Sequence, residues 1–346
     1  MRELPDVIAA RALARGPLAL ATVVAVAGSA YRRPGARLLV GESGRLAGGV
    51  SGGCLEADVT RKALQLSAGR ARVLRYDSTD DDVGLGCNGV VDVLIERLAA
   101  GPLDPLAFAA AALEGAGPAV MVTVYRGPQT GARLLRAADG AERTDLTGPL
   151  LDAAREVARV ATRSWSGPLA GADVFVEVLS PPARVVVFGT GLDVVPVVAL
   201  GRTLGWRVIV VGEAQPAVLR RRFEAASEVI FAAPADAVAA ARVDARTLAV
   251  VMTHSLERDR VLLPALLRSP ARYVGLLGPR ARAERLLGGF APTAAQRQRL
   301  HAPIGLDLGA EEPEEIALSI VSELQCLLVG GSGRNLRDRP VPIHAG

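Results

Sequence analysis

The sequence predicts an α/β protein of two domains, the second of which carries a doubly wound parallel sheet. A chain of 346 residues corresponds to two domains at the usual roughly 150 residues each. From Val185 onward, short apolar runs alternate with helical stretches, which is typical of parallel strands joined by helices. Hydrophobic residues make up 50% of the chain and aromatic residues only 3%, so Ala, Val and Leu must build the cores.

The first domain is expected over residues 1–180 and opens with a pair of strands. Leu18 to Ala27 is an apolar run typical of a buried strand, and Arg37 to Val40 is its partner after the Pro34-Gly35 turn. From Leu55 the apolar residues follow helical spacing. The other predicted elements are a strand in which Val91, Val93 and Ile95 share a face, a helical stretch at 99–117, and strands at Val120–Tyr125 and Val174–Leu179 as candidates to extend the same sheet.

The second domain is expected over residues 181–330 with a Rossmann-like fold. It follows Pro181-Pro182 and alternates strictly between strand and helix. A helix is predicted from Pro313, which suits a first helical position. The tail at 331–346 is rich in Gly, Arg and Pro, and we expect it to be loose. The predicted strands are Val185–Phe188, Val208–Val211, Glu228–Phe231, Leu248–Met252 and Tyr273–Leu277.

Charge and composition narrow the function classes. The net charge of +4 comes almost wholly from arginines scattered among acidic residues, and with few aromatic residues to stack on bases we expect no nucleic-acid partner. No run of apolar residues is long enough to cross a membrane, and charges interrupt the start of the chain. We therefore expect a cytoplasmic protein that uses its positive charge for solubility or for an anionic small molecule.

Cys54 follows a glycine-rich loop and precedes a predicted helix, which favours a functional thiol. Small residues let a ligand approach the backbone amides closely, and the helix start adds positive potential. The same field favours the thiolate form of Cys54, which ligates soft metals, so Cys54 is also the candidate metal ligand. The alternative is a small buried hydrophobe, the commonest fate of a lone cysteine. The candidate cofactor-binding residues of this loop are Gly48, Gly49, Ser51, Gly52, Gly53 and Cys54.

Two further cysteines lack any spacing typical of a zinc site or a disulfide framework. Cys87 lies in a similar glycine setting and could face Cys54 as a second cofactor ligand, although two unrelated thiols would have the same spacing. Cys326 lies on an apolar helix, where packing is the simpler interpretation. We expect all three to be free thiols.

A second glycine turn, Gly189-Thr190-Gly191, follows the first strand of the parallel sheet and opens a helix, where a phosphate can bind. Val194 replaces the third glycine of the dinucleotide pattern, and Glu213 is the candidate partner for a ribose hydroxyl. His254 and Arg280 follow neighbouring strands and should reach the same edge. A nucleotide site here and a purely structural turn both remain open.

Long ordered motifs give the chain a resemblance to the XdhC/CoxI family of accessory proteins for molybdenum hydroxylases. The resemblance implies a Rossmann-like second domain beside an XdhC-type α/β domain, with Cys54 at the position of the family cysteine taken to be needed for cofactor binding. The chain departs from the family pattern at Leu192 and Gly212. The matching motifs are Pro34-Gly35-Ala36-Arg37, GGVSGGCLEADV from Gly48, GLGCNG from Gly84, VMTHS from Val251, LLGPRAR from Leu276, and HAPIGLDLGAEEPEEIALSI from His301.

The resemblance also implies a function. It implies a chaperone without turnover of its own that binds molybdenum cofactor (molybdopterin), either bare or as a dinucleotide, and assists its protection and sulfuration with a cysteine desulfurase. It implies delivery to a xanthine dehydrogenase-like or carbon monoxide dehydrogenase-like molybdenum hydroxylase, and we expect a homo-oligomer, a dimer. The rival hypotheses are an NAD(P)-dependent oxidoreductase that uses His254 as acid or base, and a degenerate paralogue that acts only as a scaffold.

Overall fold

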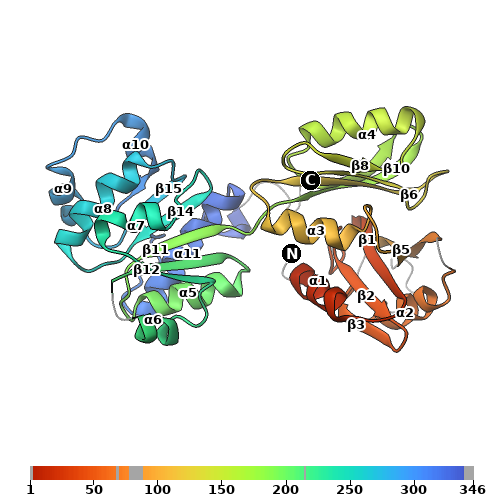
Figure 1. Ribbon diagram of the computed structural model, residues 1–346, viewed down its shortest axis with the longest axis horizontal. Coiled ribbons are helices and arrows are strands. Elements are labelled where there is room, and N and C mark those ends of the chain that lie inside the picture. The colour runs from red at the N-terminus through yellow and green to blue at the C-terminus, as the bar shows by residue number, and fades with distance from the viewer. Residues whose placement is uncertain (1–2, 68–69, 78–88, 214–215, 339–346) are drawn as a thin grey trace. The chain divides into compact units, whose positions relative to one another are not determined.

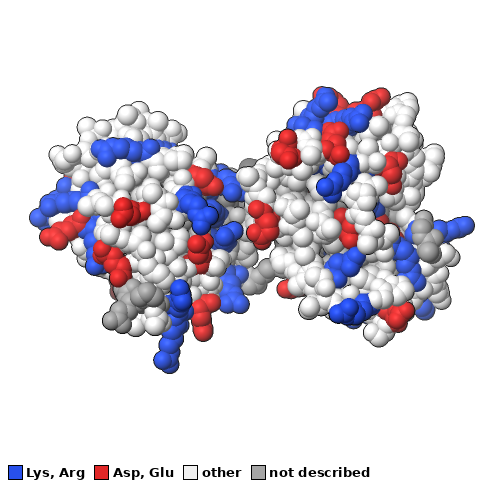
Figure 2. All heavy atoms as spheres, viewed as in Figure 1, with Lys and Arg blue, Asp and Glu red and all other residues white. Residues whose placement is uncertain are grey.

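A computed structural model describes residues 3–67, 70–77, 89–213 and 216–338 of the chain. It divides into two compact units, an N-terminal unit that ends at Pro181 and a C-terminal unit that begins at Pro182. Within the described ranges, no helix is both long and apolar enough to cross a membrane. On the face seen in Figure 2, each unit carries acidic and basic side chains interspersed rather than gathered into a basic patch.

The N-terminal unit begins with an antiparallel sheet of five strands in the order β3-β2-β1-β5-β4. The predicted pairing of the first two strands is confirmed, with Ala19 opposite Val40. Inward residues such as Val93 and Ile95 pack with helix α2 in one apolar cluster, and α1 and α3 border a second cluster. The elements are α1 (Glu3–Leu13), β1 (Leu18–Gly28), β2 (Arg37–Gly41), β3 (Gly44–Gly48), α2 (Glu56–Leu64), β4 (Ala71–Asp77), β5 (Gly89–Leu98) and α3 (Pro105–Glu114).

The strands predicted near residues 120 and 174 do not extend that sheet. They lie side by side in a second antiparallel sheet, ordered β8-β7-β6-β10-β9, and helix α4 covers it (Figure 1). Their side chains are apolar enough for either sheet, and the short strands beside them complete the second one. Its elements are β6 (Ala119–Arg126), β7 (Arg133–Arg136), β8 (Glu142–Thr144), α4 (Gly148–Val160), β9 (Trp165–Leu169) and β10 (Ala172–Leu179).

Arginine–carboxylate pairs join the two sheets of the N-terminal unit. Arg37 of β2 donates to Glu177 of β10 at 2.9 Å, and both side chains are almost fully buried. Arg133 of β7 pairs with Glu96 of β5 in the same way. Because a buried charge that loses its partner is strongly destabilising, these pairs fix the strands that carry the loops described below.

The C-terminal unit contains the predicted parallel sheet, in the order β13-β12-β11-β14-β15-β16. Its central strands are buried on both faces: Val185 and Val187 enter one apolar cluster, and Val186 and Phe188 the other. This explains why their sequences are continuously apolar rather than alternating. The strands are β11 (Arg184–Phe188), β12 (Arg207–Gly212), β13 (Glu228–Phe231), β14 (Thr247–Val251), β15 (Tyr273–Leu276) and β16 (Leu300–His301).

Helices cover both faces of this sheet, as the doubly wound pattern requires (Figure 1). Helices α5, α6 and α11 pack on one face, and α7, α8 and α9 on the other. Because β11 lies between β12 and β14, the loops after these three strands meet at one edge of the sheet. The helices are α5 (Val194–Thr203), α6 (Pro216–Arg222), α7 (Pro234–Ala240), α8 (Leu256–Arg268), α9 (Arg280–Leu287), α10 (Ala294–Arg299) and α11 (Pro313–Val329), followed by a short 3-10 turn at Leu336–Asp338.

Candidate functional site

The loop between β3 and α2 is held by one serine and one glutamate. Glu56 folds its carboxylate back over the loop, where Oε1 accepts hydrogen bonds from the N–H groups of Val50 at 3.1 Å and Ser51 at 2.9 Å. The Ser51 hydroxyl donates to Glu56 Oε2 and accepts from the N–H groups of Gly53 at 3.1 Å and Leu55 at 3.0 Å. Because Leu55 gives α2 no side-chain cap, this network takes its place.

The Glu56 carboxylate is ionised in a nearly closed environment. Glu56 is only 8% exposed to solvent. Burial acts to raise the pKa of Glu56, but the hydrogen bonds from Ser51 and Val50 outweigh burial and leave the pKa below its ordinary value. The loop is therefore built around a fixed negative charge that faces inward.

This arrangement corrects one part of the sequence interpretation. The sequence predicts backbone amides of this loop that are open to a ligand, yet the amides of Val50, Ser51 and Gly53 are used by Glu56 and Ser51. Within the described ranges, the amides of Gly52 and Cys54 are left without a partner. Cys54 is exposed, not buried, so the loop presents one thiol and two free donors.

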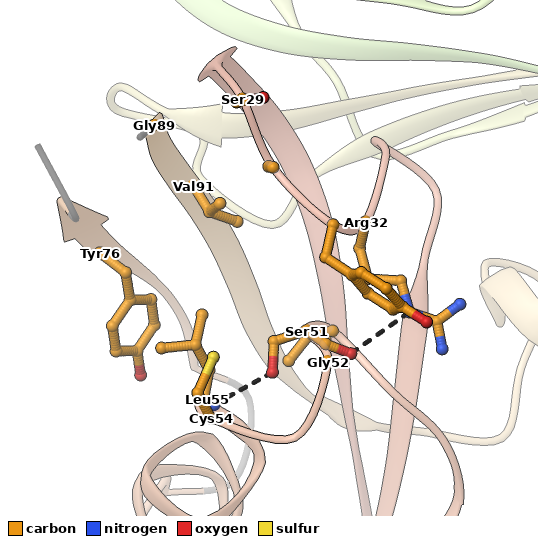
Figure 3. Close-up of a pocket in the computed structure, with 12 residues that line it drawn as sticks. Ser29, Arg32, Ser51, Gly52, Cys54, Leu55, Tyr76, Gly89 and Val91 are labelled. Carbon is orange, nitrogen blue, oxygen red and sulfur yellow. Dashed lines mark hydrogen bonds between the residues drawn. The ribbon is translucent and has the colours of Figure 1, made fainter. Parts of the chain in front are cut away.

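Cys54 lines a small cavity of about 40 Å³ together with Ser51 and Gly52. Figure 3 shows the Cys54 sulfur between the loop and Tyr76 of β4, with Arg32 on the opposite side of the loop. Arg32 Nε reaches the Ser51 carbonyl at 3.4 Å. The cavity is therefore walled by four separate segments of the N-terminal unit, which are residues 29–32, residues 50–55, Tyr76 of β4 and residues 89–91 of β5.

Tyr76 is fixed in this wall by Asp58 of α2. The Tyr76 hydroxyl donates to Asp58 Oδ2 at 2.6 Å, and Lys62 approaches the same oxygen at 2.7 Å. The hydrogen bonds from Lys62 and Tyr76 lower the pKa of Asp58 to about 2, and burial together with Asp58 raises the pKa of the Tyr76 phenol. The Tyr76 phenol therefore stays neutral near pH 7, and its hydrogen bond to Asp58 fixes the ring at the side of the cavity.

Gly48 and Gly49, the remaining residues predicted for this loop, shape its backbone. Gly48 has φ of +78°, and a Cβ there would collide with the Arg37 carbonyl, so this position needs glycine. Gly49 is buried and donates to that same carbonyl at 2.7 Å. Cys87 lies outside the described residues. Among the residues that are described, no three His, Cys, Asp or Glu side chains gather as a metal site, so the metal role of Cys54 stays a prediction.

A second cavity, of about 260 Å³, lies at the carboxyl edge of the parallel sheet in the C-terminal unit. The predicted residues Gly189, Gly191, Glu213 and His254 all line it. Arg280 does not: it begins helix α9 after β15. Four of the five residues predicted for this edge therefore line the cavity, and its lining arginine is Arg258 of α8 rather than Arg280.

The charged groups of this second cavity are already paired. The Arg258 guanidinium binds the Glu213 carboxylate at 3.0 Å. Glu213, the expected partner of a ribose hydroxyl, is therefore already engaged. Asp193 binds His254 Nε2 at 2.8 Å, and the Asp193 carboxylate fills the space that a Cβ on Gly191 would need. A carboxylate thus lies over the glycine turn, where the phosphates of a dinucleotide would have to lie.

Sequence reasoning missed Tyr31, Arg32 and Tyr76 as residues of the first cavity. Tyr31 and Arg32 lie within three residues of Pro34, so their place near a family motif was the available signal. In the second cavity it missed Asp193 as the partner of His254. No sequence spacing links these residues to the rest of either cavity, so the sequence could not have revealed them.

Comparison with known proteins places both units. The family model described as the XdhC and CoxI family matches residues 12–77, and the model described as the XdhC Rossmann domain matches residues 185–324. A crystal structure of a xanthine dehydrogenase from Bacillus halodurans superposes with a TM-score of 0.77 at 29% identity and covers 98% of both chains.

Two curated relatives extend over most of the chain. A probable xanthine dehydrogenase subunit of Bacillus subtilis is 31% identical over 88% of this chain and 91% of its own. The molybdenum cofactor insertion chaperone PaoD of Escherichia coli is 26% identical over 88% of this chain and 81% of its own. The resemblance drawn from the motifs is confirmed, and the chain belongs to the XdhC and CoxI family.

Proposed function

We propose that this protein binds molybdenum cofactor at the Cys54 loop and inserts it into a molybdenum hydroxylase of the xanthine dehydrogenase or carbon monoxide dehydrogenase kind. The similarity to a molybdenum cofactor insertion chaperone and to a probable component of xanthine dehydrogenase supports the class of cargo and client. The single observation that carries the proposal is the exposed Cys54 beside two amides that have no partner among the described residues, on a loop that is otherwise internally bonded.

The residues present fit such a cofactor. A thiolate is a soft ligand suited to the metal, and free N–H groups suit oxo or phosphate oxygens. When bound, the cofactor supplies the oxo-transfer chemistry that its client enzyme uses. The chain supplies position: the Ser51–Glu56 network holds Cys54 outward, and Tyr76 walls one side of it.

The finer parts of the proposal concern the steps before delivery. We propose that the bound cofactor, with or without an added nucleotide, is protected here and sulfurated by a cysteine desulfurase. An exposed Cys54 supports this order, because a sulfur donor needs access to the metal end of the cofactor. Cys87 remains a proposed second ligand, and a homodimer remains the proposed assembly.

The rival oxidoreductase receives less support from the second cavity. Bound phosphates there would face the Asp193 carboxylate, and Glu213 is engaged by Arg258. A carboxylate beside bound phosphates opposes their binding, because like charges repel. We therefore assign no hydride transfer to His254.

The test is anaerobic incubation of the purified protein with molybdenum cofactor, followed by gel filtration and analysis of metal and pterin. Cys54→Ser should lower the retained molybdenum at least about tenfold, as expected for loss of a metal ligand. Cys326→Ser is the matched control, because Cys326 is a half-buried thiol on α11. Equal retention by the two variants, or no retention by the unmodified protein, would contradict the proposal.

A further inference from the structure

The Cys54 cavity is too small for the cargo proposed above. Pockets that hold small organic ligands usually measure about 300 to 1,000 Å³. The space beside Cys54 measures about 40 Å³, which suits little more than the metal end of such a ligand. A neighbouring cavity of about 500 Å³ shares Tyr31 and Arg32 with it and continues past Arg33 to α1. Among the described residues, this neighbouring cavity offers room for the rest of a cofactor anchored at Cys54.

Tyr31 separates the two cavities and has no core role. It is 71% exposed, although it is a large aromatic side chain. Its ring lies beside Gly52, where a Cβ would come within 3.6 Å of two ring carbons, and the Arg32 guanidinium lies 5.5 Å from the ring centre. The ring is thus supported from the Cys54 loop and open to solvent elsewhere, as a stacking surface requires.

Arg33 provides a free cation on the same loop. Its side chain is exposed and, within the described residues, has no carboxylate partner, whereas Arg32 is engaged by Glu3 and by the Ser51 carbonyl. The backbone of Arg33 is fixed by a tight turn, since its carbonyl accepts from the Ala36 N–H at 3.1 Å and Gly35 has φ of +97°. An unpaired guanidinium on a fixed turn is suited to bind phosphate.

We propose that the loop Ser29–Arg33 is the second half of the cofactor site, with Tyr31 stacking on a flat heterocycle and Arg33 pairing with a phosphate. The inference rests on the proposed function and specifies the ligand class: a planar heterocycle joined to a group that carries both a phosphate and a metal. Thiol, ring and cation then contact three separate parts of one molecule. Tyr31 and Arg33 are binding residues in this scheme and take no part in any bond change.

The experiment separates these contacts with two probes, molybdenum cofactor and a metal-free pterin monophosphate. For the pterin monophosphate, Tyr31→Ala should raise Kd about tenfold and abolish quenching of the pterin fluorescence, as loss of one aromatic stack does. Tyr31→Phe keeps the ring and should bind within about twofold of the unmodified protein. Leu13→Ala is the control, because Leu13 is 83% exposed in the same unit and lines neither cavity.

Arg33→Ala should weaken the pterin monophosphate about tenfold but leave the unphosphorylated pterin unchanged, since a charged hydrogen bond is lost. Arg45→Ala, which removes another exposed arginine of this unit, should change neither. Cys54→Ser should affect molybdenum cofactor and not the metal-free pterin.

The outcomes keep this inference distinct from the proposed function. If molybdenum cofactor is retained through Cys54 while Tyr31→Ala and Arg33→Ala bind both probes like the unmodified protein, the Ser29–Arg33 site is wrong and the chaperone proposal stands. If the unmodified protein binds the pterin monophosphate through Tyr31 but retains no molybdenum cofactor, the pterin site stands and the chaperone proposal falls.

Discussion

The two glycine turns of this protein look alike in sequence and differ in where they place a carboxylate. Each leads into a helix, and each has an acidic residue at the helix start: Glu56 in α2 and Asp193 before α5. Glu56 points inward, where it binds the amides of Val50 and Ser51. Asp193 lies over Gly191 and binds His254, a side chain that is 60% exposed.

The difference teaches that glycines before a helix do not by themselves make an anion site. In the N-terminal unit the carboxylate is consumed within the loop, so the outer face keeps a thiol and two donors. In the C-terminal unit the carboxylate lies over the turn and binds His254. Under the proposed function, the direction of one acidic side chain decides which turn receives a phosphate or an oxo group.

The largest expected effect is on stability. Glu56→Ala leaves two buried amides and the Ser51 hydroxyl without their acceptor and should lower the free energy of unfolding of the N-terminal unit by about 3 kcal/mol. Asp193→Ala removes only a hydrogen bond to an exposed histidine and should cost the C-terminal unit less than about 1 kcal/mol.

Each unit contains one tryptophan, which makes the stability comparison measurable. Urea unfolding is followed by Trp165 in the N-terminal unit after Trp206→Phe, and by Trp206 in the C-terminal unit after Trp165→Phe. Glu56→Gln, which retains an acceptor oxygen, should fall between Glu56→Ala and the unmodified protein. Equal losses for Glu56→Ala and Asp193→Ala would show that the two carboxylates play the same part.

A smaller effect is expected on nucleotide affinity. If Asp193 blocks the second turn, Asp193→Ala should tighten ADP binding to the C-terminal unit about tenfold, because one nearby like charge is removed. Isothermal titration measures this, with Asp236→Ala on α7 as a control that removes an acid outside the cavity lining. Tight ADP binding by the unmodified protein, unchanged in Asp193→Ala, would mean that the carboxylate moves aside at no cost.

The parallel sheet could be predicted from sequence almost strand by strand, because strands such as Val185–Phe188 are buried on both faces and must be continuously apolar. The second antiparallel sheet could not. Its outer strands Glu142–Thr144 and Trp165–Leu169 are short, and the latter contains glycine and proline. Which sheet a strand joins is decided by long-range pairing, and local sequence patterns carry no signal for that.

The candidate site, like the fold, was predictable from the sequence only in part. The glycine-rich loop identified Cys54 but did not reveal the part played by Glu56. That Glu56 would turn back and bind the loop amides depends on its side-chain direction, which spacing does not fix. Tyr31 gave no signal because exposure of a single aromatic residue cannot be inferred from its neighbours.

The smallest expected effect concerns acid, and it tests whether Glu56 acts as a carboxylate. Because the pKa of Glu56 is lower in the folded chain than its ordinary value of 4.5, its contribution to stability is complete above about pH 5 and is lost as the pH falls through the folded pKa. The urea midpoint of the N-terminal unit should therefore decline toward about pH 3 more steeply in the unmodified protein than in Glu56→Gln. Stopping there keeps Asp58, whose pKa is about 2, mostly ionised, so the difference between the two proteins reports Glu56. A difference that stays constant across this range would mean that the loop is held by the shape of the Glu56 side chain and not by its charge.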